Sequence, residues 1–261
     1  KIRSAVIRRS LDLIGKLAGD EETYGTFWGQ FGPVLKEGIV EDMANRERIA
    51  PLLRFASTRG DGARPTVSLA DYVARMPEGQ DAIYYITADN YAAAAHSPHL
   101  EVFRKKGIEV LLLTDRLDEW LLQYLTEVEG RELKDIARGA LDLPDAGESA
   151  AVEVEPDKDD KDLLKRLKRA LRDQVGEVRS SQRLTDSASC IVLGDQEMAL
   201  HLQRLLEQAG LVIHKEAEGG RSERYYDRFR DRIMFQYENL KSQINPHFLF
   251  NSFSTLIALI E

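Results

Sequence analysis

Cysteine is the scarcest residue in the sequence: Cys190 stands alone among 261 residues. A lone cysteine excludes an internal disulfide. Its apolar neighbours, Ile191 to Leu193, are typical of a small residue in a buried strand rather than of a reactive thiol. No apolar run approaches the roughly 20 residues that cross a bilayer, and the charged start of the chain lacks the apolar centre of a signal peptide. These absences predict a cytoplasmic protein without a membrane segment.

Phosphate-binding loops and metal sites are also missing from the sequence. It contains neither a G-x-G-x-x-G loop nor a G-x-x-x-x-G-K-S/T loop. His96 and His99 are three residues apart, but Pro98 lies between them and no third ligand is near, so a structural role is favoured over zinc binding. Carboxylates are too scattered to indicate an acid–base pair. We therefore expect no cofactor and no metal to be bound by this chain.

Basic charge is in the minority. The chain has 36 Lys and Arg residues against 44 Asp and Glu residues, which gives a formal net charge of −8. This balance argues against general nucleic-acid binding, which needs a basic face. The hydrophobic fraction of 43% and the charged fraction of 31% exclude a disordered chain, and the length leaves room for two modest domains.

Hydrophobic periodicity indicates a mixed architecture in the first half of the chain. Two β-branched or apolar runs, 82–87 and 110–113, predict strands, and Gly107 predicts the end of the helix between them. This strand–helix–strand unit implies a right-handed parallel crossover. Trp28 and Trp120 fall on apolar helix faces and are expected to pack in or near the core. The predicted helices cover 2–17, 22–37, 45–55, 69–76, 91–106 and 117–125.

The second half begins with a change of composition. Residues 143–160 are rich in alanine, proline and acidic side chains, which predicts a linker. A helix over 162–175 has one apolar and one basic face; acidic residues precede it, so a solvated face is favoured over membrane or nucleic-acid binding. Further strands are expected over 178–184 and 189–193, and a helix over 196–208.

The C-terminal stretch, 223–261, reads as one long amphipathic helix. Tyr226, Phe229 and Ile233 follow a heptad spacing, and Gln236 interrupts it. Beyond Ile244 the apolar residues cover more than one face, and such a helix is stable only when it is buried. We therefore predict a homodimer through 225–261. The fold class is α/β (α+β): a helical preface and strand–helix–strand domain, a small α+β domain, then this dimerisation helix.

A proline and a histidine lie together inside that helix, in the block Asn-Pro-His-Phe-Leu-Phe-Asn. A neutral imidazole is a nucleophile near physiological pH. The stretch 236–252 resembles the phosphoacceptor helix of sensor histidine kinases of the LytS/YehU type. The resemblance implies that His247 accepts phosphate from ATP, that Asn251 gives possible support one turn away, and that a response regulator is the partner. The ATP-binding domain of that family is not found in the sequence, so self-phosphorylation is not expected.

A second set of sequence blocks lies in the rest of the chain: 26–38, 52–58, 67–73, 83–87, 97–101, 105–113, 118–120 and 183–186. In this order, the blocks resemble a different family, the bacterial heat-shock chaperone HtpG. The resemblance implies part of a middle domain over 1–142, a truncated C-terminal domain over 161–211, and unfolded protein clients. The ATPase domain of that family would precede Lys1 and is expected to be missing.

The two resemblances meet at a polar, glycine-containing junction over 212–222. One interpretation is a chimeric chain that joins a chaperone fragment to a kinase helix. The alternative is a natural cytoplasmic signalling protein in which the chaperone-like part is a scaffold or sensor for that helix. ATP serves both intact parent families, but this chain has no complete active site, so whether it is an enzyme stays open.

Overall fold

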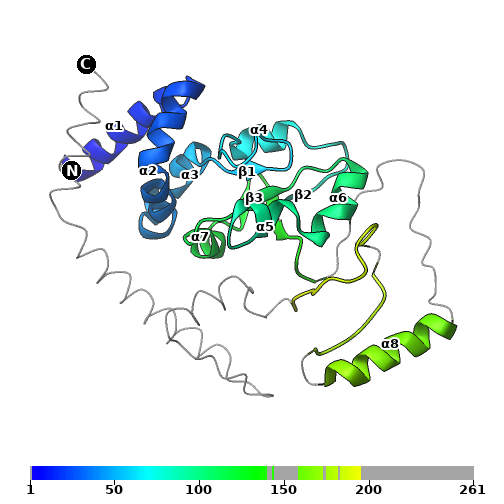
Figure 1. Cartoon of the computed structure of the whole chain (residues 1–261). Helices are drawn as coiled ribbons and strands as arrows, with labels where there is room; N and C mark the ends of the chain where they lie inside the picture. The colour runs from blue at the N-terminus through cyan, green and yellow to red at the C-terminus, as the bar shows by residue number, and fades with distance from the viewer. Residues whose placement is uncertain (1, 140–142, 144–157, 173–174, 182, 195–261) are drawn as a thin grey trace, which may run out of the picture. The chain divides into compact units, whose positions relative to one another are not determined.

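A computed structural model describes residues 2–139, 143, 158–172, 175–181 and 183–194 (Figure 1). The chain divides into two units, Lys1–Leu211 and Val212–Glu261, and every described residue belongs to the first. Several predicted features therefore lie outside the described residues: most of the linker, the helix over 196–208, the junction and the dimerisation helix.

The helical preface consists of α1 (Ile2–Leu17) and α2 (Glu21–Glu41). The first helix matches the prediction, and the second continues four residues past the predicted end at Glu37. Asp20 begins α2 as its N-cap, because its carboxylate accepts from the Thr23 amide at 2.7 Å. Pro33 does not end α2, which goes on to bury Leu35, Lys36 and Ile39.

The helix predicted over 45–55 is only one turn long. α3 covers Arg46–Ile49 and is flanked by 3-10 turns over Met43–Asn45 and Ala50–Leu52. Pro51 has no N–H to donate to a longer helix, and Leu53 is already extended, with φ −68° and ψ 148°. The prediction of a longer helix was wrong because it followed the apolar spacing and gave too little weight to Pro51.

A five-stranded mixed sheet has the order β1-β3-β2-β5-β4. β2 (Ala82–Thr87) pairs in parallel with β3 (Leu111–Leu113), which confirms the predicted strand–helix–strand pairing. β2 also pairs in parallel with β5 (Arg131–Asp135). Two short antiparallel strands, β1 (Ala56–Ser57) and β4 (Glu127–Val128), form the edges.

The helical segment between β2 and β3 is broken. It consists of α5 (Tyr91–Ala95), a 3-10 turn over Pro98–Leu100 and α6 (Glu101–Lys106). The single helix predicted over 91–106 is wrong because Pro98 disfavours a helical residue before it, and Ser97 is extended. Gly107 ends α6 with φ +66°, as predicted.

The remaining helices of this part are α4 (Leu69–Ala74) and α7 (Asp118–Tyr124). Ser68 and Asp71 form a reciprocal capping box at the start of α4. The central strands are buried on both faces, and the Tyr84 and Phe103 rings meet edge to face at 5.0 Å between centroids. α2 packs against α3 and α7.

α8 covers Lys158–Leu171, where a helix over 162–175 was predicted. Its Leu163 and Leu167 are 50% and 42% exposed. The strands predicted over 178–184 and 189–193 are wrong: within the described part of these stretches, the backbone makes only a parallel bridge between Leu193 and Arg138. Between the two stretches, the amides of Thr185, Asp186 and Ser187 bind the Glu101 side chain instead of a neighbouring strand.

Candidate functional site

A pocket of ≈ 430 Å³ lies between α2, the segment that leads into β1, and the loop between β3 and α7. Apolar and charged side chains both contribute to its walls. Gly32 makes room for the indole of Trp28, because a Cβ there would lie 2.9 Å from the ring. The lining residues are Trp28, Gly32, Pro33, Lys36, Arg54, Phe55, Ala56, Ala63, Pro65, Leu112, Thr114, Asp115, Arg116 and Asp118.

A buried ion cluster forms the floor of the pocket. The Lys36 ammonium lies 2.6 Å from Asp118 Oδ1 and 3.4 Å from Asp115 Oδ2, and it lies 5.6 Å above the Phe55 ring. The Lys36 and Asp118 side chains are 8% and 2% exposed. Burial raises the pKa of Asp118, and the Lys36 ammonium opposes that rise. The charged form of Asp118 therefore depends on Lys36.

The same carboxylates shape the loop before α7. Asp118 Oδ2 accepts from the Asp115 amide at 2.9 Å, and Asp115 Oδ1 accepts from the Leu117 amide at 3.1 Å. Both acids are thus engaged with backbone and with Lys36, which leaves no spare base for proton transfer. The cluster supports the shape of a binding surface rather than a catalytic centre.

Two guanidinium groups stand at the rim. Arg54 lies 4.4 Å from the centroid of Tyr24 and donates to the carbonyls of Pro51 and Leu53. Arg116 is exposed and, within the part of the chain that the structure describes, makes no hydrogen bond or ion pair. Arg116 is therefore available to an incoming acidic group next to the apolar walls.

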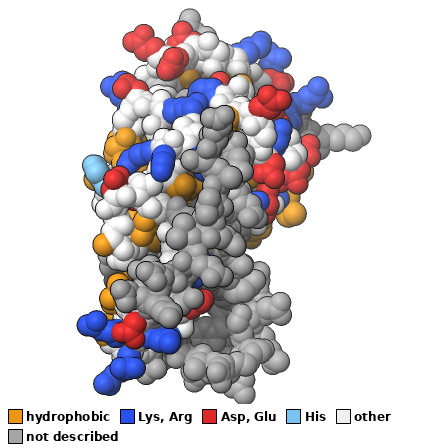
Figure 2. All heavy atoms as spheres, turned by 90° about the vertical axis from the view of Figure 1, so that its right-hand side faces the viewer, with side chains coloured by type: hydrophobic (Ala, Val, Ile, Leu, Met, Phe, Trp, Pro, Cys, Tyr) orange, Lys and Arg blue, Asp and Glu red, His pale blue; other side chains and the backbone are white. Residues whose placement is uncertain are grey.

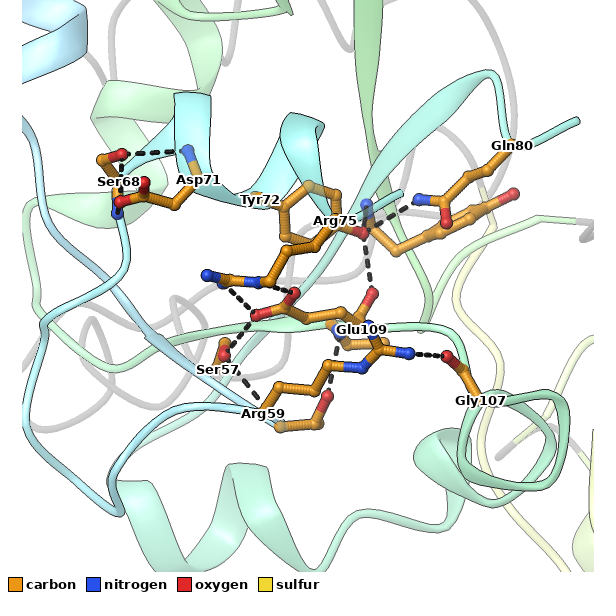
Figure 3. Close-up of polar contacts among 12 residues, drawn as sticks. Ser57, Arg59, Ser68, Asp71, Tyr72, Arg75, Gln80, Gly107 and Glu109 are labelled. Atoms are coloured by element: carbon orange, nitrogen blue, oxygen red, sulfur yellow. Dashed lines mark hydrogen bonds and ion pairs between the residues drawn. The ribbon is translucent and has the colours of Figure 1, made fainter. Parts of the chain in front are cut away.

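A second polar network centres on Glu109, which is 4% exposed (Figure 3). Its carboxylate accepts from Ser57 Oγ at 2.6 Å and from the Arg75 guanidinium at 2.8 and 3.0 Å. The Tyr72 hydroxyl donates to the Glu109 carbonyl at 2.7 Å, and burial raises the pKa of Tyr72. Ser57 is only 1% exposed and Glu109 is neutralised by Arg75, so this is a structural network and not an activated nucleophile.

The two histidines that were weighed as a metal pair make separate backbone contacts. His99 Nε2 lies 3.0 Å from the Ile191 carbonyl, and His96 Nδ1 lies 2.8 Å from the Ala92 carbonyl. Burial lowers the pKa of His99, and the charge of Arg183 lowers it further. Among the described residues no three His, Cys, Asp or Glu side chains form a group suited to a metal ion.

His247 and Asn251, the residues predicted from the sequence, lie outside the described residues, so their role stays a prediction. Trp28 is buried and Trp120 is half-buried, as expected. Cys190 is half-buried outside any strand, and burial raises the pKa of its thiol. The sequence reasoning missed Lys36. It lies two helical turns after Trp28 on the buried face of α2, so a charged residue on an apolar face was the available signal.

Charges of both signs occur on the face of the described residues that Figure 2 presents. Figure 2 shows acidic and basic side chains interspersed on the described part of the face that it presents, with apolar patches between them. Such mixing does not resemble the basic stripe of a nucleic-acid-binding surface. Every helix within the described residues is too short or too polar to cross a bilayer.

Comparisons with known proteins find two separate families. The family described as Hsp90 protein matches residues 1–225, and the family described as Histidine kinase matches residues 235–261. Chaperone protein HtpG of Alkalilimnicola ehrlichii is 56% identical over 214 residues, which are 80% of this chain and 33% of that protein. Chaperone protein HtpG of Paraburkholderia xenovorans is 55% identical over 221 residues, which are 80% of this chain and 34% of that protein.

Among solved structures, the middle domain of a putative heat shock protein of Plasmodium falciparum is 32% identical, with a TM-score of 0.48. The match covers 52% of this chain and 55% of that one. The chain spans about a third of the length of the curated relatives that it matches.

Proposed function

The chain belongs to the Hsp90 family, and on that premise we propose that it joins a client-binding part of an HtpG-like chaperone to a histidine-kinase phosphoacceptor helix. The observation that carries the proposal is the presence of both family matches in separate, non-overlapping stretches of one chain. The identity of 56% to a protein named as a chaperone supports the first half. The block around His247 supports the second half.

For the chaperone half, the pocket above the Lys36 cluster is the proposed contact for unfolded clients. The apolar residues among its lining, such as Trp28, Phe55 and Leu112, suit an exposed hydrophobic side chain of a client. Arg116 at its rim suits an acidic group beside that side chain. Neither contact requires nucleotide, so weak client binding by the chain alone is the expected activity.

Light scattering from a thermally unfolding client enzyme tests this half. Increasing amounts of the chain should slow aggregation, and Arg116→Gln should weaken the effect several-fold for an acidic client. Arg9→Gln is the matched control, because Arg9 is also exposed and lies on α1, which does not line the pocket. No suppression at a tenfold molar excess of chain would reject the chaperone half.

For the kinase half, we propose that His247 accepts a phosphoryl group and passes it to an aspartate of a response regulator. Asn251, one helical turn away, is proposed to support the imidazole. ATP enters only through a kinase catalytic domain, and a homodimer through 225–261 is the proposed state of this helix. Sedimentation at micromolar concentration tests the dimer, and a chain ending at Gly220 is the control that should be monomeric.

The second candidate function is a natural signalling protein, in which the chaperone-like part acts as scaffold or sensor for the phosphoacceptor helix. The same pair of family matches favours it, because they lie on one chain. It differs in one consequence: an unfolded client should change the rate at which His247 is phosphorylated. A client-independent rate favours a chimeric chain whose two halves work separately.

A further inference from the structure

Residues 183–194, which we call the strap, lie against the end of β5 and the start of α6. At one end, the Arg183 side chain is buried, and its guanidinium donates to the carbonyls of Ile136 at 3.0 Å and Arg138 at 3.1 Å, and to Gly139. At the other end, the Leu193 amide donates to the Ala137 carbonyl at 3.0 Å. The strap is therefore anchored at both ends to the backbone that follows β5.

Glu101 holds the middle of the strap. Its carboxylate accepts from the backbone amides of Thr185 at 2.6 Å, Asp186 at 2.9 Å and Ser187 at 3.1 Å, and also from the Ser187 hydroxyl. Hydrogen bonds to a charged acceptor are stronger than neutral ones. These donors, with the Ser187 hydroxyl first, lower the pKa of Glu101 to about 2. One ionised side chain thus organises three consecutive peptide groups.

The strap buries little apolar surface. Leu193 is 8% exposed, whereas Ile191 is 63% exposed and the residues between Thr185 and Cys190 are exposed or half-buried. In contrast, the central strands β2 and β3 are almost wholly buried. Segments held by solvent-facing hydrogen bonds and few apolar contacts open locally at a much lower free energy than the core.

We propose that residues 183–194 form a releasable strap, which opens while the sheet stays folded, and that Glu101 is the positioning residue that closes it. The strap is also the covalent path from the sheet to the residues that follow, which include the second family match. This inference concerns the fold alone and does not depend on client binding or on phosphorylation.

Amide hydrogen exchange on the full chain tests the proposal through two groups that do not touch Glu101. The amides of Leu193 and Gly139 bond across the strap and the end of β5, at 3.0 and 3.1 Å. In Glu101→Gln, they should exchange roughly tenfold faster or more, as expected when several hydrogen bonds to a charge are lost. Amides of β2 and β3 should keep their wild-type rates.

Labelling of Cys190 by a maleimide gives a second readout, because it is the chain's single cysteine and lies on the strap. For each variant, the labelling rate of the folded chain is divided by the labelling rate of the same variant unfolded in urea. This ratio corrects for differences in the reactivity of the exposed thiol. The ratio should rise with Glu101→Gln and, by less, with Ser187→Ala. Glu78→Gln is the matched control, since Glu78 is exposed and makes none of these contacts.

Two results overturn the proposal. One is an unchanged rate at Leu193 and Gly139 in Glu101→Gln, which shows that Glu101 does not close the strap. The other is an equal acceleration at Ile86 and Leu112, which shows that the strap opens only with the whole core. Ser187→Ala removes one donor and leaves Glu101 in place, so it keeps the test decisive where Glu101→Gln fails to fold.

Discussion

Replacing Lys36 by methionine removes the ammonium from the buried cluster and leaves two carboxylates without their counter-ion. Methionine keeps the length and apolar stem of lysine, so packing against Phe55 is retained. Asp118, with a side chain only 2% exposed, cannot regain water without opening the pocket. The effect therefore measures the unpaired charge rather than a cavity.

The expected loss of stability is about 3–5 kcal/mol, the usual result of removing one partner of a buried ion pair. Since most domains are stable by only about 5–15 kcal/mol, this is a large fraction of the total. For a chain of this size it corresponds to a fall in Tm of roughly 6–20 °C. The double variant Lys36→Met/Asp118→Leu should recover most of the loss, because it removes both charges.

The stability of Lys36→Met should depend on pH through the protonation of Asp118. Burial raises the pKa of Asp118 above the ordinary value of 3.8, and without the Lys36 ammonium the main opposition to that rise is lost. A raised carboxyl pKa favours folding while the acid is neutral, and that contribution is lost as the pH rises through the folded pKa. The stability gap between Lys36→Met and wild type should therefore be smaller at pH 5 than at pH 8.

Urea denaturation followed by far-UV circular dichroism, and in parallel by the fluorescence of Trp28 and Trp120, measures the loss. Glu47→Gln, on the exposed side of α3, serves as control and should stay within about 0.5 kcal/mol of wild type. A single Lys36→Met variant as stable as wild type, or a double variant less stable than the single one, would refute the buried-pair account.

Three further predictions concern other parts of the described structure. Because the pKa of Glu101 is lowered, its carboxylate should keep the hydrogen bonds to Thr185–Ser187 above the ordinary pKa of 4.5 and lose them as the pH falls towards about 2. The amide NMR shifts of those residues should follow this loss, and constant shifts across that pH window would contradict the prediction. Gly32→Ala places a Cβ 2.9 Å from the Trp28 ring, so overpacking should cost about 1–3 kcal/mol of folding stability and outweigh the gain in helix propensity. Urea denaturation measures the net change, and a variant more stable than wild type would show that the indole moves aside. Limited proteolysis should cut first in the linker predicted from composition, 143–160, and equal resistance there and in 110–113 would argue against a linker.

Local sequence patterns predicted those helices and strands whose signals come from neighbouring residues. The apolar runs of β2 and β3 and the left-handed Gly107 were recognisable because each depends on residues close in sequence. β5 was not recognisable: Arg131–Asp135 is mostly charged, and it joins the sheet through its backbone pairing with β2. Such pairing depends on the partner strand and leaves little trace in the side chains.

The pocket was beyond prediction for a related reason. Its residues come from α2, from the segment before β1 and from the loop before α7, and only tertiary packing brings them together. Lys36 and Asp118 are 82 residues apart in sequence, and neither position signals the other. The strap is a similar case, since its amides at Thr185 and Asp186 bind Glu101, which lies more than 80 residues earlier in the sequence.

The measurement that bears most directly on the central claim is phosphorylation of His247 in the full chain. A catalytic domain of a LytS-type kinase, ATP and magnesium are added, and the chain alone gives the background. The account predicts an acid-labile label on His247, identified by mass spectrometry, that is absent in His247→Gln and retained in His96→Gln. A label that survives acid, or that is equal in His247→Gln, would contradict a chain that joins an Hsp90-family part to a phosphoacceptor helix.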